Sequence, residues 1–339
     1  MGASISVTKT KNHGGNIIAD ILGGNFNSFS QTIIGSIGNV GPKVTIKVPL
    51  ATDITVAKVH GEVTIGDILG DVSISMETSD DVEIGNTKNC NVTVDGSGAF
   101  QIGDVEGNFD ITVNGSGDTD VNNVEGTVVA LINGRGGIDI SGGKASIFDV
   151  KNTASGEFAF GGIAHNAKIT LGGMGGIEVS ETIGDLTIAS DGSGDIEISK
   201  VGGGKIGAKL NGRGGISIED GNATLMHVVS NGSGEFEFDG VALDTSLVLT
   251  GRGGIDITKI NGDLDITTSG SGDIDIDGGA VGNLKVDLSG RGGVSFDGRA
   301  VDADLKSTGS GDIDVTFVKN KPSITQRGRG SITVDNWDD

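Results

Sequence analysis

A short glycine-flanked turn recurs along the chain, and its spacing restricts the accessible folds more than any other feature. The residue at the centre of the turn is serine, arginine or, once, methionine, and successive centres lie 19 or 20 residues apart. Weaker copies lie upstream, centred on Gly41, His60 and Ser79, at steps of 18 and 19. The regular centres are Ser97, Ser116, Arg135, Ser155, Met174, Ser193, Arg213, Ser233, Arg252, Ser271, Arg291, Ser310 and Arg329. Repeats of this length indicate units that bury their cores by stacking on their neighbours.

Within each copy, apolar residues alternate with polar ones on both sides of the centre. The third and fifth residues after a centre are apolar, as in Ile196 and Ile198. A second alternating run precedes the next centre, as in Leu264 and Ile266. A period of two is typical of a strand with one buried face, and no stretch shows the period of a helix. Each copy therefore contains two short strands and two turns.

We therefore predict an all-β chain, a single-domain parallel β-helix or solenoid with about 19–20 residues per coil and about 15–16 coils. Uniform spacing favours stacked coils over antiparallel hairpins, because equivalent residues then form columns. We expect residues 41–335 to form the solenoid, residues 1–40 an N-terminal cap or irregular first coils, and residues 336–339 a charged C-terminal tail. The chain has 62 glycines and 3 prolines, and we expect the glycines to occupy turns where φ is positive.

Charge and composition argue against several classes of protein. The net charge of −22 disfavours a nucleic-acid binder and disfavours attraction to anionic lipid, because both need a basic surface. No apolar run is long enough to cross a membrane. Cys90 is the only cysteine, which leaves no partner for an intramolecular disulfide. The first residues lack the basic and apolar regions of a secretory signal, so we expect a cytosolic chain or one whose signal has been removed.

The repeated turn alternates between Gly-Ser-Gly followed by an acid and Gly-Arg-Gly-Gly. Five of the seven arginines occupy a turn centre, four of them in Gly-Arg-Gly-Gly and Arg329 in Gly-Arg-Gly-Ser. In a parallel stack each arginine lies between acids of two neighbouring coils, which predicts an inter-coil ion-pair ladder that also sets the register. The alternative is that the arginine row is a docking surface for an acidic ligand. The ladder comprises Arg135, Arg213, Arg252, Arg291, Arg329, Asp118, Glu157, Asp195, Glu235, Asp273 and Asp312.

Acids also form a column four residues after the centres. Calcium binds six to eight oxygen atoms, so stacked carboxylates could gather it, and the calcium candidates are Glu237, Asp256 and Asp275. A solvated acidic face that prevents aggregation of the sheet explains the same column and is the interpretation we favour. We therefore expect no cofactor, with calcium as the one candidate ion.

Two segments and one repeated motif resemble a known family. The segments are VTIKVP at residues 44–49 and TDITVAKVHGEVTI at residues 52–65, and the motif is Gly-Ser-Gly-Asp-Ile-Asp-Ile, as at residues 270–276. They are similar to the bacterial GIN-domain family of autotransporter-adhesin head domains and to related envelope proteins with β-strand repeats. The resemblance covers about residues 40–335. It implies a β-repeat fold and an adhesion role, and it supplies no catalytic residues.

The expected function is a non-enzymatic structural or adhesion module, a rigid repeat rod of the bacterial cell envelope or extracellular space. Its expected partner is itself or another envelope or surface component. A filament subunit that stacks end to end is the alternative, because the ends of a solenoid are open strand edges. A polysaccharide-active β-helix enzyme is a further alternative. It is disfavoured because the constant coil length and the absence of tyrosine leave little to build a sugar-binding cleft.

Overall fold

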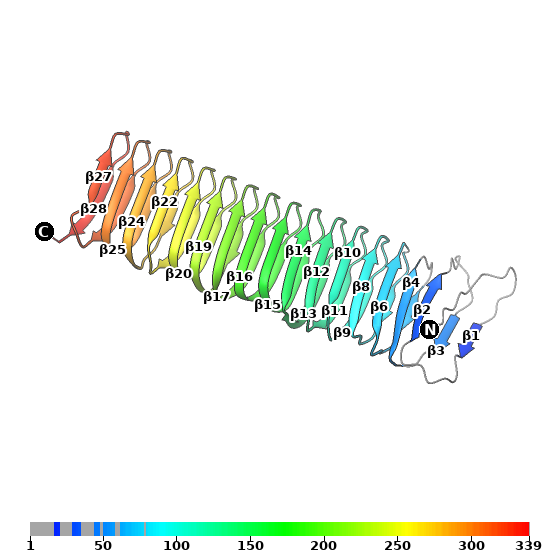
Figure 1. Ribbon diagram of the computed structural model, residues 1–339. Helices are drawn as coiled ribbons and strands as arrows, with labels where there is room; N and C mark the ends of the chain where they lie inside the picture. The colour runs from blue at the N-terminus through cyan, green and yellow to red at the C-terminus, as the bar shows by residue number, and fades with distance from the viewer. Residues whose placement is uncertain are drawn as a thin grey trace. The chain divides into compact units, whose positions relative to one another are not determined.

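The computed structural model describes residues 17–20, 29–34, 44–47, 50–57, 62–77 and 79–338, with side chains described from residue 50 onward. These residues form β-strands and turns and contain no helix. The chain folds as a parallel β-solenoid of about 15 turns with roughly 19 residues in each (Figure 1). The predicted fold class is therefore confirmed, and the strand pairs whose register is defined are parallel.

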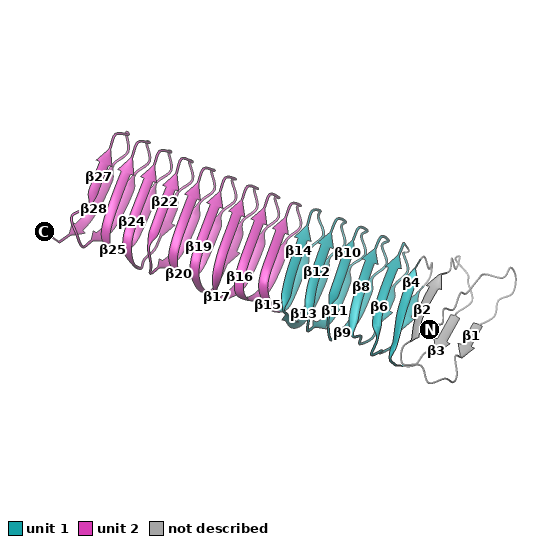
Figure 2. Cartoon of the chain, viewed as in Figure 1, with its two compact units in different colours: residues 1–162 teal, residues 163–339 magenta. Residues whose placement is uncertain are grey.

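The chain divides into two compact units, Met1–Gly162 and Ile163–Asp339 (Figure 2). Strand β15 (Phe158–Leu171) contains the boundary. The strands of unit 1 are β1 (Ile17–Asp20), β2 (Phe29–Ile34), β3 (Val44–Lys47), β4 (Thr52–Ala57), β5 (Val63–Ile65), β6 (Asp71–Met76), β7 (Val82–Ile84), β8 (Asn89–Val94), β9 (Phe100–Val105), β10 (Phe109–Val113), β11 (Thr119–Val124), β12 (Thr127–Ile132), β13 (Ile138–Ala145) and β14 (Ile147–Asn152). Within unit 1, β10 lies between β8 and β12.

Unit 2 contains the longer strands and most of the alternating turns. Its strands are β16 (Ile177–Ser190), β17 (Ile196–Leu210), β18 (Ile216–Ile218), β19 (Gly221–Ser230), β20 (Phe236–Leu249), β21 (Ile255–Ile260), β22 (Leu264–Thr268), β23 (Ile274–Ile276), β24 (Ala280–Leu288), β25 (Val294–Ser307), β26 (Ile313–Val318), β27 (Ser323–Gln326) and β28 (Ile332–Trp337). Equivalent residues pair along the stack, as Ile177 with Ile196 and Ile196 with Ile216. This register places inward side chains in continuous columns.

The predicted boundaries of the cap, the solenoid and the tail stay predictions. The predicted cap at residues 1–40 falls mostly outside the described residues. At the other end, β28 continues to Trp337 and so includes two residues of the predicted tail. That the two units together form one domain stays a prediction.

The core of unit 2 is a column of inward aliphatic and aromatic side chains. Phe236 and Phe238 are both fully buried, with 0% of their surface exposed. The ring of Phe238 turns toward the backbone of Gly240, and a Cβ atom built on Gly240 would lie 2.5 Å from the ring Cζ. The Phe-X-Gly sequence is therefore a packing unit, because only glycine leaves room for the ring.

A second buried column of unit 2 alternates between small and large residues. It lies directly before the turns, and it alternates hydroxyl residues with leucine from one coil to the next. This alternation lets each leucine fill the space that a smaller neighbour leaves. The hydroxyl oxygens of this column are buried and have no hydrogen-bond partner. The column is Ser190, Leu210, Ser230, Leu249, Thr268, Leu288 and Ser307. The core thus alternates from one coil to the next, between a hydroxyl residue and leucine, as the turn centres alternate between serine and arginine.

The glycines that flank the turn centres have a different role from the one predicted, whereas Gly279, in a second turn, has the predicted positive φ. Among the described glycines, positive φ occurs at Gly143, Gly184, Gly203, Gly221 and Gly279, none of which flanks a turn centre, and Asn166 is the one described residue of another type with positive φ. A Cβ atom on the glycine before a centre would instead lie within 3.0 Å of a carbonyl oxygen of the preceding coil, a separation that real Cβ atoms essentially never show. At these glycines the coils approach too closely for a Cβ atom. Ala154, before the centre Ser155, is the exception at this position among the regular centres.

Candidate functional site

The turns of the last coils line an open groove of about 830 Å³ on unit 2. Its lining consists only of glycine, serine, threonine and arginine, and it includes no acid. We call it the arginine groove. It is lined by Thr250, Gly251, Arg252, Ser269, Gly270, Ser271, Ser289, Gly290, Arg291, Thr308, Gly309, Ser310, Arg327, Gly328 and Arg329. A lining without carboxylates is notable on a chain whose net charge is −22.

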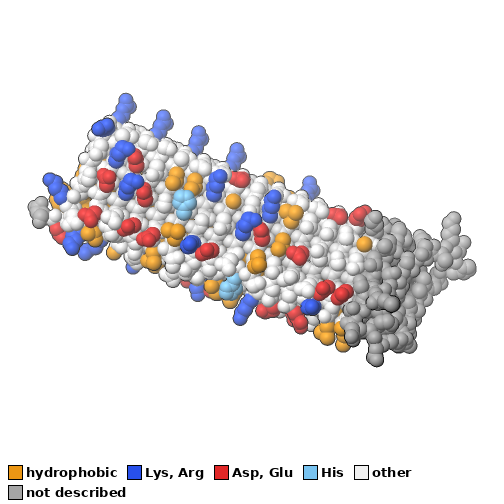
Figure 3. Space-filling model, in the orientation of Figure 1, with side chains coloured by type: hydrophobic (Ala, Val, Ile, Leu, Met, Phe, Trp, Pro, Cys, Tyr) orange, Lys and Arg blue, Asp and Glu red, His pale blue; other side chains and the backbone are white. Residues whose placement is uncertain are grey.

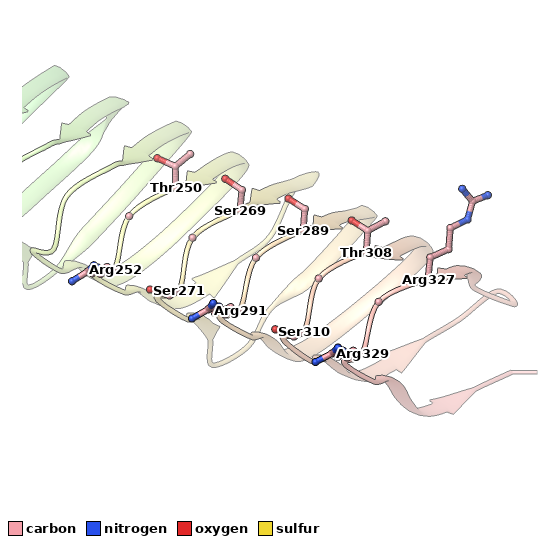
Figure 4. A pocket seen from close by; sticks show the side chains of 15 residues that line it. Thr250, Arg252, Ser269, Ser271, Ser289, Arg291, Thr308, Ser310, Arg327 and Arg329 are labelled. Atoms are coloured by element: carbon pink, nitrogen blue, oxygen red, sulfur yellow. The ribbon is translucent and has the colours of Figure 1, made fainter.

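Three parallel rows of residues form the arginine groove (Figure 4). The glycines form its floor, between two rows of side chains. The first of these, which we call the hydroxyl row, contains Thr250, Ser269, Ser289 and Thr308, and continues to Arg327. The second, which we call the tip row, contains the turn centres Arg252, Ser271, Arg291, Ser310 and Arg329. Arginine therefore recurs on every second coil of the tip row.

The backbone of the turns is hydrogen-bonded within the stack. The amide of Arg252 donates to the carbonyl of Gly232 at 2.8 Å, and the amide of Ser271 donates to the carbonyl of Gly251 at 2.9 Å. The same bond, one coil back, recurs at the other tip-row centres of the groove. Because these amides are already paired, a ligand in the groove must be recognised mainly by side chains.

The acids that follow the serine centres are paired with backbone amides. Asp195 Oδ1 accepts a hydrogen bond from the amide of Gly215 at 2.7 Å, and Asp273 Oδ1 accepts one from the amide of Gly293 at 2.7 Å. In unit 1, Asp118 Oδ1 accepts from the amide of Gly137 at 2.8 Å. At the last coil, Asp312 Oδ1 accepts from both the amide and the hydroxyl of Ser331. Each carboxylate thus satisfies the amide just before the strand of the next coil.

The predicted ladder of arginine–acid ion pairs stays a prediction. Two ion pairs of unit 2 join Lys285 to Asp265 at 3.0 Å and Lys306 to Asp287 at 2.6 Å, and neither includes an arginine of the tip row. The predicted arginines Arg135, Arg213, Arg252, Arg291 and Arg329 are exposed. Figure 3 shows basic side chains projecting at intervals along one edge of the molecule.

Glutamate replaces aspartate in two of the predicted acid positions, Glu157 and Glu235. Glu235 is one methylene longer than its aspartate counterparts, and its side chain hydrogen-bonds to the Asp256 carboxyl group. The structure therefore links this member of the predicted ladder to a predicted calcium candidate rather than to an amide.

A ladder of side-chain hydrogen bonds leads into the hydroxyl row and was not predicted from the sequence. Asn211 Nδ2 donates to Asp191 Oδ1 at 2.6 Å, and Asn231 Nδ2 donates to Asn211 Oδ1 at 2.9 Å. Thr250 Oγ1 then donates to Asn231 Oδ1 at 2.6 Å. All four residues directly precede the first glycine of a turn. The repetition of a polar residue at that position was the sequence feature from which the ladder could have been predicted. The ladder fixes the start of the hydroxyl row.

The calcium candidates lie in register on adjacent strands but do not form a metal centre. Glu237 pairs with Asp256, and Asp256 pairs with Asp275. The described residues contain no group of three or more histidine, cysteine, aspartate or glutamate side chains placed to hold a metal ion. Burial raises the pKa of Asp256 to about 7, with further contributions from Glu235 and from the repulsion of Asp275 and Glu237. Burial also raises the pKa of Asp275.

The raised pKa of Asp256 predicts a pH-dependent stability. Its pKa of about 7 exceeds its ordinary value of 3.8, so folding favours the protonated carboxyl group. The stability from this group is fully present below about pH 4 and is lost as the pH rises through about 7. We expect the Tm of the chain to fall between about pH 4 and pH 7, and Asp256→Asn to flatten that fall.

The matched control for this prediction is Asp220→Asn, which removes one charge from an exposed position of unit 2, whereas Asp256 is half-buried. Thermal unfolding followed by circular dichroism measures both variants. If Asp256→Asn and Asp220→Asn change the pH profile equally, the profile reflects net charge and not the acid column.

Comparison with known families gives a match over unit 2. The family model described as "Putative auto-transporter adhesin, head GIN domain" matches residues 163–278 and, in a second overlapping copy, residues 223–336. The two matches cover more than half of the 339 residues and include the arginine groove. No curated protein and no solved structure matches the chain. The described residues contain no helix with the length and hydropathy that a membrane span requires.

Proposed function

The chain belongs to the auto-transporter adhesin family with the head GIN domain, and from this membership we propose a non-enzymatic structural and adhesion module of the bacterial cell envelope or extracellular space. The family itself suggests an extracellular or envelope location and a partner among surface components. The arginine groove is the observation that supports adhesion most directly. It offers an ordered cationic face on a rigid, hydrogen-bonded stack.

Electrostatics explains how such a module would meet a surface. The net charge of the chain is −22, so an anionic cell component is repelled by most of the protein's exterior. The lining of the arginine groove contains arginine and no acid, so its own side chains carry only positive charge. An anionic surface component would therefore be approached with this face first, because long-range charge orients the encounter.

Surface labelling of intact cells tests this proposal. An antibody raised against unit 2 is applied to living and to permeabilised cells of the bacterium that expresses the chain, with an antibody against a cytosolic protein as the control. We expect the unit 2 antibody to label intact cells while the control labels only permeabilised cells. Labelling that requires permeabilisation for both antibodies would exclude a surface location.

The described residues offer no observation that favours either alternative, the filament subunit or the polysaccharide-active enzyme. Electron microscopy of the purified chain separates the first alternative from the proposal. Long fibres with a uniform width would favour the filament subunit, whereas single short particles are expected of an adhesion module.

A further inference from the structure

We propose that the arginine groove binds a linear acidic polysaccharide that carries one carboxylate on every second sugar. This inference rests on the proposed adhesion function and specifies its ligand. It follows from the chemistry of the groove lining, from the spacing of its arginines and from the absence of side chains on its floor.

The lining of the groove matches a ligand that is both anionic and rich in hydroxyl groups. Arg252, Arg291 and Arg329 offer planar guanidinium groups that bind carboxylates with two parallel hydrogen bonds. On the opposite side, Thr250, Ser269, Ser289 and Thr308 are exposed and offer hydroxyl oxygens that can accept a hydrogen bond. Two of these hydroxyls already donate within the protein, Thr250 to Asn231 Oδ1 and Ser289 to the carbonyl of Thr268. The lining has no apolar side chain, so an apolar ligand would gain nothing there.

The spacing of the tip row selects among anionic polymers. Arginine alternates with serine from coil to coil, at Arg252, Ser271, Arg291, Ser310 and Arg329. Adjacent coils lie about 4.8 Å apart, so neighbouring arginines recur about every 9.6 Å. An extended β-linked disaccharide has about the same length. A polysaccharide with one uronate in each disaccharide would therefore present a carboxylate to every arginine in turn.

A nucleic acid fits this groove less well than a polysaccharide. Phosphates recur about every 3.4 Å along each strand of duplex DNA, roughly three times as densely as the arginines recur. Single-stranded nucleic acids are held by stacking of their bases on aromatic side chains, and the groove lining contains none. The charge density and the lining therefore both favour the sparsely charged polymer.

The floor of the groove allows a polymer to lie close to the protein. Gly251, Gly270 and Gly290 line the groove, and each lies in the chain between a residue of the hydroxyl row and a residue of the tip row, so no side chain stands between the two rows at these positions. The same glycines bring the coils close together, as described above for the turns. One structural constraint thus produces both the close stacking of the coils and the open channel along them.

Binding of defined oligosaccharides to the full chain tests the inference. The probes are a hyaluronan octasaccharide, with a carboxylate on every second sugar, and a neutral dextran of the same length, measured by isothermal titration calorimetry. We expect the hyaluronan probe to bind and dextran not to bind. The variant Arg252→Gln/Arg291→Gln/Arg329→Gln should bind the hyaluronan probe at least about tenfold more weakly, because three charge-assisted contacts are lost.

The matched control is Lys200→Gln/Lys259→Gln/Lys319→Gln, which removes the same number of positive charges from exposed positions outside the groove. It should bind the hyaluronan probe as the unmodified chain does. The Tm of each variant shows whether it is folded. An equal loss of affinity in both triple variants would overturn the inference, because net charge alone would then explain binding.

The spacing argument has its own test. Ser271→Arg/Ser310→Arg fills the intervening positions of the tip row and reduces the arginine spacing to about 4.8 Å. This variant should gain affinity for polygalacturonate, which carries a carboxylate on each sugar, by more than it gains for the hyaluronan probe. An equal gain for both polymers would overturn the assignment of the disaccharide period.

Two further outcomes separate this inference from the proposed function. If the hyaluronan probe does not bind although the unit 2 antibody labels intact cells, the ligand is wrong and the surface role stands. If a duplex DNA of similar length binds as tightly as the hyaluronan probe, the ligand class is also wrong. If the antibody labels only permeabilised cells, the proposed function fails whatever the titrations show.

Discussion

Gly253→Ala is expected to destabilise unit 2 by about 3 kcal/mol or more, because overpacking against a rigid backbone is among the costliest single substitutions. A Cβ atom on Gly253 would overlap the carbonyl oxygen of Gly234, one coil earlier. That oxygen belongs to the backbone and cannot rotate away as a side chain can. Gly234 in turn lies over the carbonyl of Gly214, so any shift passes along the stack. Denaturant unfolding of the full chain, with hydrogen exchange to locate the effect, measures the loss.

Gly207→Ala is the matched control for this prediction. It makes the same chemical change in the same unit, but a Cβ atom on Gly207 would meet nothing within 4 Å, and its φ lies outside the left-handed region. We expect this variant to be neutral or more stable by about 0.4–1 kcal/mol, because alanine restricts the unfolded chain. Equal destabilisation by the two variants would contradict close coil stacking as the reason for glycine in the turns.

The fold could be predicted because both of its requirements recur in every repeat: apolar residues alternate along each strand, and a constant repeat length aligns them from coil to coil. Apolar residues such as Ile196 and Ile198 alternate on strands, and the constant spacing aligns them with Ile216 and Ile218 one coil later. The reason for the turn glycines could not be predicted in the same way. Positive φ and close approach of backbone both select glycine, and one sequence does not distinguish them. Only the distance between coils shows that close approach is the cause.

The candidate site could be predicted as a column but not in its contacts. The register that pairs Ile196 with Ile216 places Asp195 beside Gly215, and the Asp195 carboxylate contacts the Gly215 amide at 2.7 Å. Backbone amides leave no signature in a sequence, so the pairing with an amide was missed. The Asn211–Asn231 ladder was also missed, although asparagine recurs there at one position of consecutive repeats. The groove itself could not be predicted from the sequence, because it depends on the directions in which the side chains of the hydroxyl row and the tip row point on either side of the glycines.

Phe238→Ala is expected to destabilise unit 2 by about 3–5 kcal/mol, the usual cost of removing a fully buried aromatic ring. Phe238 has 0% exposure and pairs in register with Ile218 and Ile257 of the neighbouring coils. The cavity cannot collapse readily, because hydrogen-bonded coils fix the spacing on both sides. Denaturant unfolding measures the change in the free energy of unfolding.

The effect of Phe238→Ala should also be local, because each coil of a solenoid contacts only its neighbours. Hydrogen exchange should therefore accelerate most in β18, β20 and β21, which contain Phe238 and its paired residues. Phe317→Ala is the matched control: this ring is only half-buried and lies 5.0 Å from the Arg299 guanidinium. Its loss should cost about 1 kcal/mol, because less surface leaves water. Uniform acceleration across unit 2 in Phe238→Ala would mean that the unit unfolds all at once, and that the columns are coupled beyond adjacent coils.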